Sequence, residues 1–245
     1  MALRALIFDV DGTLADTEMA HLQAFNTAFA EHGCDWSWDV PTYTELLRVT
    51  GGKERIVHFG RHVLAGEGPN PIDDPAWVAQ VHERKTELYT DMVASGEVSM
   101  RPGVIPLIEA AAAAEIPMAI ATTTSPANID ALLTWALGSQ WRTLFQVVED
   151  AHTAPCKKPD PSVYRQALRR LDVSPGHSVA FEDSENGLRA ALGAEIPTIV
   201  TPNVFTATQD FSGAAQVVPS LADVTLAQIE SWCDFSLRVS PTSAS

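Results

Sequence analysis

Four acidic residues stand close together near the start of the chain, in the stretch FDVDGTLADTE at residues 8–18. They are Asp9, Asp11, Asp16 and Glu18, and they begin directly after a short apolar run that is typical of a buried strand. Carboxylates at this spacing repel one another unless a cation lies among them. Hard oxygen ligands without His or Cys suit Mg²⁺, and a carboxylate beside such an ion can act as a nucleophile.

Two other stretches bring charge to the ends of apolar runs. VAFEDSENG places Glu182 and Asp183 after one run, and CKKPDP places Lys158 before a helical pattern, with Lys157 as a solvated neighbour. Because ligands of parallel α/β sheets lie at the carboxyl ends of the strands, we expect these side chains to gather beside Asp9. An Asp after a strand is often only a turn or capping residue. Three charged stretches together favour a site for Mg²⁺ and a phosphate.

Hydroxyl groups end a further apolar run, IATTTS at residues 120–125. Alone, Thr and Ser at such a place are as often turn and helix-capping residues. Beside a metal site, Thr122 and the backbone amides after it would form an uncharged phosphate cradle. Thr122, Thr123 and Thr124 are therefore predicted to contact the phosphate.

The apolar runs predict the strands of a parallel sheet, because they are nearly continuous and helical patterns separate them. The expected strands are residues 6–10, 118–122, 145–149, 178–182 and 198–201. We therefore predict an α/β fold. More than a hundred residues separate the first two strands, which is far more than one crossover helix needs and predicts an inserted domain.

The insertion contains helical patterns and no candidate strand. Helices are expected over residues 17–33, 41–48, 53–65 and 75–94, with a polar turn at 66–75. Pro102 and Gly103 mark the return from the insertion. The predicted division is a catalytic core over residues 1–16 and 99–238, a helical cap over 17–98 and a flexible tail over 239–245.

The cap segment TGGKER superficially resembles a phosphate-binding P-loop. Leu47 stands where a P-loop has its first Gly, and Glu54 stands where Ser or Thr is required, so that interpretation fails. A glycine pair ending at Gly52, followed by Lys53 and Arg55, would instead suit a distal phosphate if the cap faces the core. The alternative is a turn followed by a solvated helix start.

Composition and charge exclude several classes of partner. The 245 residues carry 16 basic and 31 acidic side chains, a net charge of −15, which argues against a nucleic-acid surface or an anionic membrane as main partner. Three isolated cysteines argue against a disulfide framework or a zinc site. No stretch approaches the ~18 apolar residues of a membrane helix. We expect a cytoplasmic monomer that acts on a small molecule.

Taken together, the motifs resemble the four motifs of the haloacid dehalogenase superfamily, in the same order and at approximately the same spacing. They are Asp9-x-Asp11-Gly-Thr13, Thr122 at a second strand end, Lys158-Pro, and Glu182-Asp183-Ser184. The set covers nearly the whole chain and is specific, although each motif alone would be weak. The resemblance implies a Rossmann-like core with a parallel sheet and a mobile helical cap inserted after the first motif.

The resemblance also implies roles for the motif residues. Asp9 would attack phosphorus to form an aspartyl-phosphate, and Asp11 would protonate the leaving alkoxide and then deprotonate the hydrolytic water. Thr122 and Lys158 would hold the transferring phosphoryl group, with Lys158 also offsetting carboxylate charge. The implied Mg²⁺ ligands are the Asp9 carboxylate, the Asp11 backbone carbonyl and Asp183, with Glu182 in support.

Within the superfamily, several stretches look similar to the CbbY-like sugar-phosphate phosphatases. They are FDVDGTLADTE, TGGKERI, ATTTS, KKPDPSVYR and EDSENGLRAA. The implied substrate is xylulose 1,5-bisphosphate, a misfire product and inhibitor of Rubisco in the Calvin cycle, with xylulose 5-phosphate as product. A β-phosphoglucomutase-like enzyme, a phosphatase for another small phosphorylated metabolite, and a catalytically silent binding module are the alternatives.

Three cap residues complete the predicted site. Glu18 and His21 lie on one helical face near the inward apolar stripe, and the resemblance implies that they contact sugar hydroxyls. A surface position for His21 is an equal alternative. Tyr43 is a weaker candidate for substrate contact, with core packing as its alternative.

Overall fold

The structure is a computed structural model that describes residues 3–63 and 70–233. At its centre these residues form a parallel sheet with the strand order β3-β2-β1-β4-β5-β6. The strands are β1 (Ala5–Phe8), β2 (Met118–Ala121), β3 (Val147–Glu149), β4 (Ser178–Glu182), β5 (Thr198–Val200) and β6 (Gln216–Val217). The predicted α/β fold and its five strands are confirmed. β6 was missed because two half-exposed residues at a sheet edge give no periodic signal.

Strands are added to the sheet on both sides of β1. β1 pairs with β2 on one side and with β4 on the other, both in parallel register. The later strands then add outward from β2 and from β4. The strand order therefore reverses between β1 and β4, and in open α/β sheets ligands bind at such a point, beyond the carboxyl ends of the strands.

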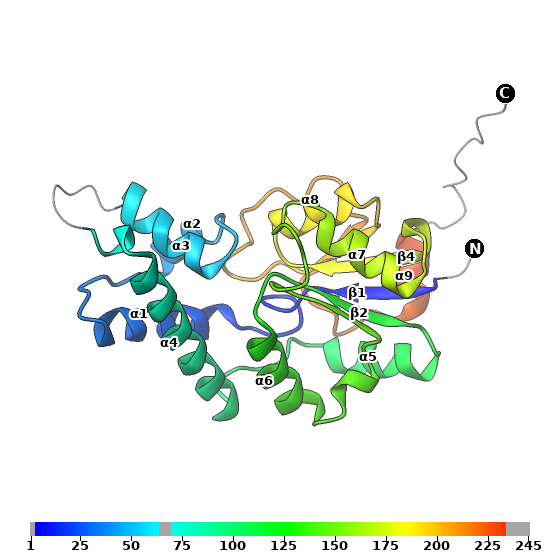
Figure 1. Ribbon diagram of the computed structural model, residues 1–245. Helices are drawn as coiled ribbons and strands as arrows, with labels where there is room; N and C mark the ends of the chain where they lie inside the picture. Colours follow the sequence, from blue (N-terminus) through cyan, green and yellow to red (C-terminus); the bar gives the residue numbers. More distant parts are fainter. Residues whose placement is uncertain (1–2, 64–69, 234–245) are drawn as a thin grey trace.

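Helices cover both faces of the sheet (Figure 1). On one face lie α5 (Val104–Ala113) and α6 (Pro126–Leu137), and on the other lie α7 (Ser162–Leu171) and α8 (Glu185–Gly193), while α9 (Leu226–Cys233) contacts α5. Successive residues of β1 point to opposite faces. Phe8 stacks on Phe181 at 4.7 Å between ring centroids in one hydrophobic cluster, whereas Ile7 belongs to the cluster on the other face.

Between β1 and α5 the described residues form helices beyond the carboxyl edge of the sheet (Figure 1). These are α1 (Glu18–Glu31), α2 (Val40–Leu46), α3 (Gly52–His58), the π-helix η1 (Phe59–Val63), the short 3-10 helix η2 (Pro71–Asp73) and α4 (Pro75–Ala94). An aromatic cluster that includes Phe25, Phe29, Trp38 and Tyr43 packs them together. The cap therefore has a hydrophobic cluster of its own, while Ala20, Tyr89 and Val93 of α1 and α4 belong to a cluster of the sheet.

Two cap predictions need correction at their ends. The helix expected over 53–65 is α3 followed by a π-helical turn that ends at Val63, and residues 64 and 65 lie outside the described part of the chain. Residues 70–75 of the turn expected at 66–75 are described. The Asn70 side chain caps η2 by accepting a hydrogen bond from the Ile72 amide, and the Asp74 side chain caps α4 by accepting one from the Ala76 amide. The periodic signal of a helix does not show these capping interactions.

The chain enters and leaves the cap at neighbouring positions. The Asp16 amide donates to the Ser99 carbonyl at 3.0 Å, and Ala15 and Met100 form an isolated bridge. Arg101 donates to the Gly12 carbonyl and lies 3.4 Å from the Asp16 carboxylate. We therefore keep the division into a core over 1–16 and 99–238 and a cap over 17–98 as a proposal. The tail predicted over 239–245 lies outside the described residues.

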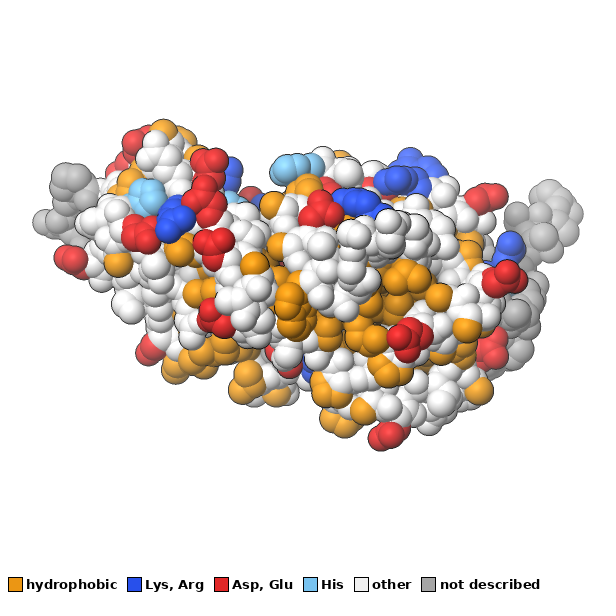
Figure 2. Space-filling view, turned by 90° about the horizontal axis from the view of Figure 1, so that it is seen from below, with side chains coloured by type: hydrophobic (Ala, Val, Ile, Leu, Met, Phe, Trp, Pro, Cys, Tyr) orange, Lys and Arg blue, Asp and Glu red, His pale blue; other side chains and the backbone are white. Residues whose placement is uncertain are grey.

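The surface agrees with the acidic composition. Figure 2 shows Asp and Glu side chains spread over both parts of the face viewed from below, with few Lys and Arg among them. Among residues 3–63 and 70–233, helices long and apolar enough for a membrane span are absent.

Candidate active site

A cavity of about 860 Å³ lies between the cap and the carboxyl edge of the sheet, and it brings most of the predicted residues together. The predicted residues that line it are Asp9, Asp11, Glu18, His21, Gly52, Lys53, Arg55, Thr122, Thr123, Thr124, Lys158, Glu182 and Asp183. Tyr43 is fully buried beside the cavity rather than on its wall. The strand ends and the cap thus face one space, as the sequence predicted.

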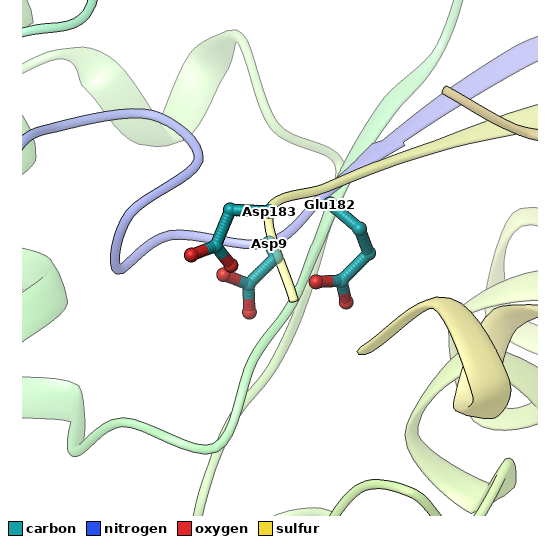
Figure 3. Close-up of side chains that lie close together, drawn as sticks. All are labelled: Asp9, Glu182 and Asp183. Carbon is teal, nitrogen blue, oxygen red and sulfur yellow. The ribbon is translucent and has the colours of Figure 1, made fainter. Parts of the chain in front are cut away.

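Three carboxylates form the floor of this cavity. Asp9 directly follows β1, Glu182 ends β4 and Asp183 follows it, and one oxygen of each lies within 4.8 Å of the others. Figure 3 shows the Asp9 and Asp183 carboxylates close together, with that of Glu182 on the other side of Asp9. All three residues are buried. Such an all-oxygen group matches the ligand preference of Mg²⁺.

Lys158 contacts two of these acids. Its Nζ atom lies 2.6 Å from Asp9 Oδ1 and 2.6 Å from Glu182 Oε1, and Tyr164 donates a hydrogen bond to the same Glu182 oxygen. The side chain of Lys158 is only 5 % exposed. A Cβ at Gly187 would lie 1.8 Å from Glu182 Oε2, so this position of α8 must be a glycine for the carboxylate to fit. Glu182 is therefore fixed tightly by its neighbours.

The charge balance of the floor fits a bound cation. Burial, together with the negative charges of Glu182 and Asp11, raises the pKa of Asp9 to about 7 even against the attraction of Lys158. Burial and the charges of Asp9 and Glu182 also raise the pKa of Asp183 well above its usual value. One lysine does not compensate three buried carboxylates. A divalent cation among them would return Asp9 and Asp183 to their ionised forms.

Asp183 is positioned by the loop after β5. Its Oδ2 atom accepts a hydrogen bond of 2.7 Å from the Asn203 side-chain amide. A Cβ at Gly12 would lie 2.3 Å from the same oxygen. Gly12 has a positive φ of 76°, so the Asp-x-Asp-Gly motif needs glycine both for its turn and for the close approach of Asp183.

Asp11 points away from this group of acids and toward the cap. His21 Nε2 lies 3.0 Å from Asp11 Oδ1, and Lys85 Nζ lies 2.7 Å from His21 Nδ1. A charged lysine can only donate, so Nδ1 accepts and Nε2 carries the proton that is donated to Asp11. The imidazole also stacks on the Tyr89 ring at 4.0 Å between centroids. The alternative surface position for His21 is therefore wrong, because the residue is 5 % exposed and held on three sides.

This chain of contacts sets the charge of Asp11. Burial opposes the ionised carboxylate, but the attraction and hydrogen bond of His21 and the charge of Lys85 outweigh it and lower the pKa of Asp11 to about 2. Burial and the nearby charge of Lys85 lower the pKa of His21, which favours a neutral ring. Burial also lowers the pKa of Lys85 to about 8. In this arrangement Asp11 is in its base form.

The threonines predicted as a phosphate cradle line the cavity after β2. Thr122 is 1 % exposed, and its hydroxyl oxygen accepts a hydrogen bond from the Thr124 amide at 3.3 Å. The Thr124 hydroxyl accepts from the Asn128 side chain at 2.9 Å. Ser125 caps α6 through the Asn128 amide, so hydroxyl capping and cavity lining occur in one segment. Contact with a phosphate stays a prediction for these residues.

On the cap side, Glu18, Tyr43 and Arg55 form a connected group. The Tyr43 hydroxyl donates to Glu18 Oε2 at 2.8 Å and accepts from Arg55 Nη1 at 3.3 Å. Arg55 also donates to the Leu46 carbonyl. Tyr43 therefore packs in the aromatic cluster, as the alternative to substrate contact predicted. Its hydroxyl also orients Glu18 at the cavity wall.

Lys53 and Gly52 lie at the start of α3 on the cavity wall. Lys53 is exposed and makes no ion pair with any part of the chain that the structure describes. The start of α3 contacts both the core and α4. Glu54 forms an ion pair with Lys157 of the core at 2.6 Å. On the other side His82 lies so close that a Cβ at Gly52 would be 2.4 Å from its Nε2. Lys157, expected as a solvated neighbour, therefore links core and cap.

Sequence reasoning missed His82, Lys85 and Asn203. Lys85 and Tyr89 belong to the buried stripe of α4 that also contains Val78 and Val81. The sequence does indicate Lys85, because it stands among apolar residues that recur every three or four positions and so form the buried face of a helix. A lysine can be buried there only if its ammonium group has a hydrogen-bond or charge partner. His82 stands on the same stripe, four residues after Val78 and three before Lys85, and is half-buried. Asn203 lies in an irregular loop and has no such signal.

The chain is similar to proteins of a known family. Residues 3–195 match the family of haloacid dehalogenase-like hydrolases. A protein CbbY from Cupriavidus necator is 53 % identical over 90 % of this chain and 87 % of its own length.

Two solved structures of CbbY from Rhodobacter sphaeroides are also similar. One, in complex with phosphate, has 46 % identity and a TM-score of 0.83, with 90 % of this chain and 96 % of the other covered. The second is a variant in complex with xylulose-(1,5)bisphosphate, with the same identity and coverage and a TM-score of 0.84.

Proposed function

The chain belongs to the haloacid dehalogenase-like hydrolases and is a phosphatase, and from this premise we propose that it hydrolyses xylulose 1,5-bisphosphate to xylulose 5-phosphate. The observation that carries the chemistry is the buried group of Asp9, Lys158 and Glu182 beside Asp183, at the floor of a cavity that the cap covers. The similarity to a CbbY that binds this sugar bisphosphate supports the substrate.

We propose Asp9 as the nucleophile. Its Oδ1 is bonded to Lys158, which leaves the second carboxylate oxygen for attack on phosphorus. The attack forms the aspartyl-phosphate and releases the sugar alkoxide. Lys158 and the Thr122 hydroxyl, both at the cavity wall, offset and orient the phosphoryl oxygens. Water then attacks the same phosphorus and regenerates the Asp9 carboxylate with release of inorganic phosphate.

Asp9, the Asp11 backbone carbonyl and Asp183, with Glu182 in support, would hold Mg²⁺ in this scheme. The buried, undercompensated carboxylates described above fit such an ion. When bound, Mg²⁺ supplies positive charge to the phosphoryl oxygens and keeps the nucleophile ionised.

Asp11 performs the proton transfers. Bonded to His21 it is ionised, which is the form that removes a proton from the hydrolytic water. The same side chain must be protonated to act as acid toward the leaving alkoxide. A bound phosphoryl group places negative charge near Asp11 and raises its pKa, which favours this protonation in the substrate complex.

The cap residues Glu18, Lys53 and Arg55 face the same cavity and provide the proposed selectivity. The carboxylate of Glu18 accepts hydrogen bonds from sugar hydroxyls, while the cations of Lys53 and Arg55 bind the phosphate that is not hydrolysed. His21, through its bond to Asp11, acts on the proton-transfer group rather than on a sugar hydroxyl.

Phosphate release tests the function. The purified protein with Mg²⁺ should release one inorganic phosphate per xylulose 1,5-bisphosphate and leave xylulose 5-phosphate. Exhaustive EDTA treatment should abolish this release, and Mg²⁺ should restore it, whereas Zn²⁺ should not restore it efficiently because the site offers neither His nor Cys. Conversion of a sugar 1-phosphate to its 6-phosphate without phosphate release would identify the mutase instead. Full activity after chelation would contradict the metal assignment.

A further inference from the structure

One core residue belongs to the hydrophobic cluster of the cap. Phe205 follows β5 in the core part of the chain, yet it is 4 % exposed and packs with the aromatic residues of the cap. Its ring meets that of Tyr43 edge to face, with 5.9 Å between centroids and an interplanar angle of 89°. The preceding residue, Val204, is 80 % exposed. The loop therefore inserts one side chain and leaves its neighbour in solvent.

The loop that carries Phe205 is fixed to the floor of the cavity. The Phe205 amide donates to Asn203 Oδ1 at 2.8 Å, and the Asn203 side-chain amide donates to Asp183 Oδ2 at 2.7 Å. The backbone amide of Asn203 also donates to the Thr206 hydroxyl. One asparagine side chain thus connects the buried acid of the core to the backbone of the residue that enters the cap.

The cap residue that Phe205 contacts is the one that orients the wall of the cavity. Tyr43 is fully buried, donates to Glu18 and accepts from Arg55. The edge-to-face contact with the Phe205 ring limits the positions of the Tyr43 hydroxyl. Displacement of the ring would move the hydrogen-bond partner of Glu18 and of Arg55 together.

We propose that Phe205 is a positioning residue for substrate selection: it sets the location of Tyr43, and through it the orientation of Glu18 and Arg55 relative to the catalytic floor. This inference rests on the proposed function, in which Glu18 and Arg55 contact the part of the substrate remote from the reacting phosphate. The effect of losing Phe205 should therefore fall on binding of the bisphosphate rather than on the chemical step.

The kinetic test compares Phe205→Ala with its exposed neighbour variant Val204→Ala, each assayed with Mg²⁺. Phe205→Ala should raise KM for xylulose 1,5-bisphosphate about tenfold with kcat changed less than about twofold, and leave kcat/KM for p-nitrophenyl phosphate unchanged. Phe205→Leu, which retains most of the buried volume, should recover most of the loss. Val204→Ala should match the unaltered protein. Equal losses on both substrates, or an unchanged KM for the bisphosphate, would overturn the proposal.

A second measurement needs no substrate. Amide hydrogen exchange in α2, which carries Tyr43, should be faster in Phe205→Ala than in Val204→Ala, while exchange in β1 and β4 stays the same. Unchanged exchange in α2 would overturn the positioning role even if the protein proved inactive on the bisphosphate. Conversely, a protein that never hydrolyses the bisphosphate but shows the faster exchange would refute the proposed substrate and leave the link between Phe205 and Tyr43 standing.

Discussion

The floor of the cavity and its cap wall differ in how their charged side chains are paired. At the floor, Lys158 contacts Asp9 and Glu182 at 2.6 Å each, and all three side chains are at most 10 % exposed. At the cap wall, Arg55 bonds to a hydroxyl and a carbonyl, and Lys53 is exposed without an ion pair in the described chain.

The difference separates chemistry from selection. Groups at the floor are fixed before any ligand binds, so they are prepared for charge that develops during reaction and act on any phosphate monoester that reaches them. Within the described residues, neither Lys53 nor Arg55 forms an ion pair, and an anionic group of the substrate would supply the missing partner. Variants of Asp9, Lys158 or Glu182 should therefore affect all substrates, and variants of Lys53 or Arg55 only those with a second anionic group.

The largest effect is expected at the floor. Asp9→Asn should lower phosphatase activity by several orders of magnitude on the bisphosphate and on p-nitrophenyl phosphate alike, because a carboxamide is a poor nucleophile and a weak Mg²⁺ ligand. Thermal unfolding should show a folded protein. Asp16→Asn, a partly exposed acid of the same segment that does not line the cavity, should retain activity. Near-normal turnover of Asp9→Asn would remove Asp9 from the mechanism.

An intermediate effect is expected at the cap. A charge-assisted contact is worth about 1.5 to 3 kcal/mol, so Lys53→Ala or Arg55→Ala should lower kcat/KM for xylulose 1,5-bisphosphate roughly tenfold to a hundredfold. The change with p-nitrophenyl phosphate, which has no distal phosphate, should be slight. Arg61→Ala supplies the control, because Arg61 is an exposed cap cation outside the cavity wall.

Equal losses on both substrates would mean that Lys53 and Arg55 support the cap as a whole. No loss on either substrate would return them to the solvated surface that the sequence left open. Lys53→Ala is the sharper of the two tests, because Arg55 also holds Tyr43 and the end of α2.

The smallest effect concerns stability. Burial and the charges of Lys85 and Lys53 lower the pKa of His82 to about 3, against 6.5 for an unperturbed histidine. Below pH 6.5 the unfolded chain binds a proton at this residue and the folded chain does not, so the free energy of unfolding falls as pH falls, by about 1.4 kcal/mol per pH unit until about pH 3. His82→Gln should remove this contribution.

Urea unfolding at pH 7 and pH 5.5 measures the contribution of His82 to the free energy of unfolding. Between these values the loss of unfolding free energy should be about 1.4 kcal/mol smaller in His82→Gln than in the unaltered protein. His152→Gln, which alters an exposed histidine on the core side of the cavity, serves as the control variant. An identical pH dependence in His82→Gln would mean that His82 accepts a proton in the folded protein.

How much the sequence predicts differs between the same two walls. The floor was predictable because Asp9, Glu182 and Thr122 each end an apolar run, and parallel strands bring such ends to one edge. The cap was predictable only in part, because helical periodicity gives the buried face of a helix and not its partner. Thus the apolar stripe of α4 indicates that Lys85 is buried and bonded, but not that its partner is His21. Phe205 gave no signal that its neighbours would come from another part of the chain.

The hydrogen bond from the Asp16 amide to the Ser99 carbonyl has a consequence for engineering and for the history of such chains. Because this bond joins the two ends of the proposed cap, replacing residues 17–98 with a different insert should leave the path of the sheet and its connections unaltered. A chimaera made at these two positions would keep Asp9 and the acidic floor and exchange the selecting residues, and its insert would have to replace His21 and Lys85 as partners of Asp11. The same adjacency would let an insertion of another length be acquired or lost at this point, provided that Asp11 keeps equivalent partners.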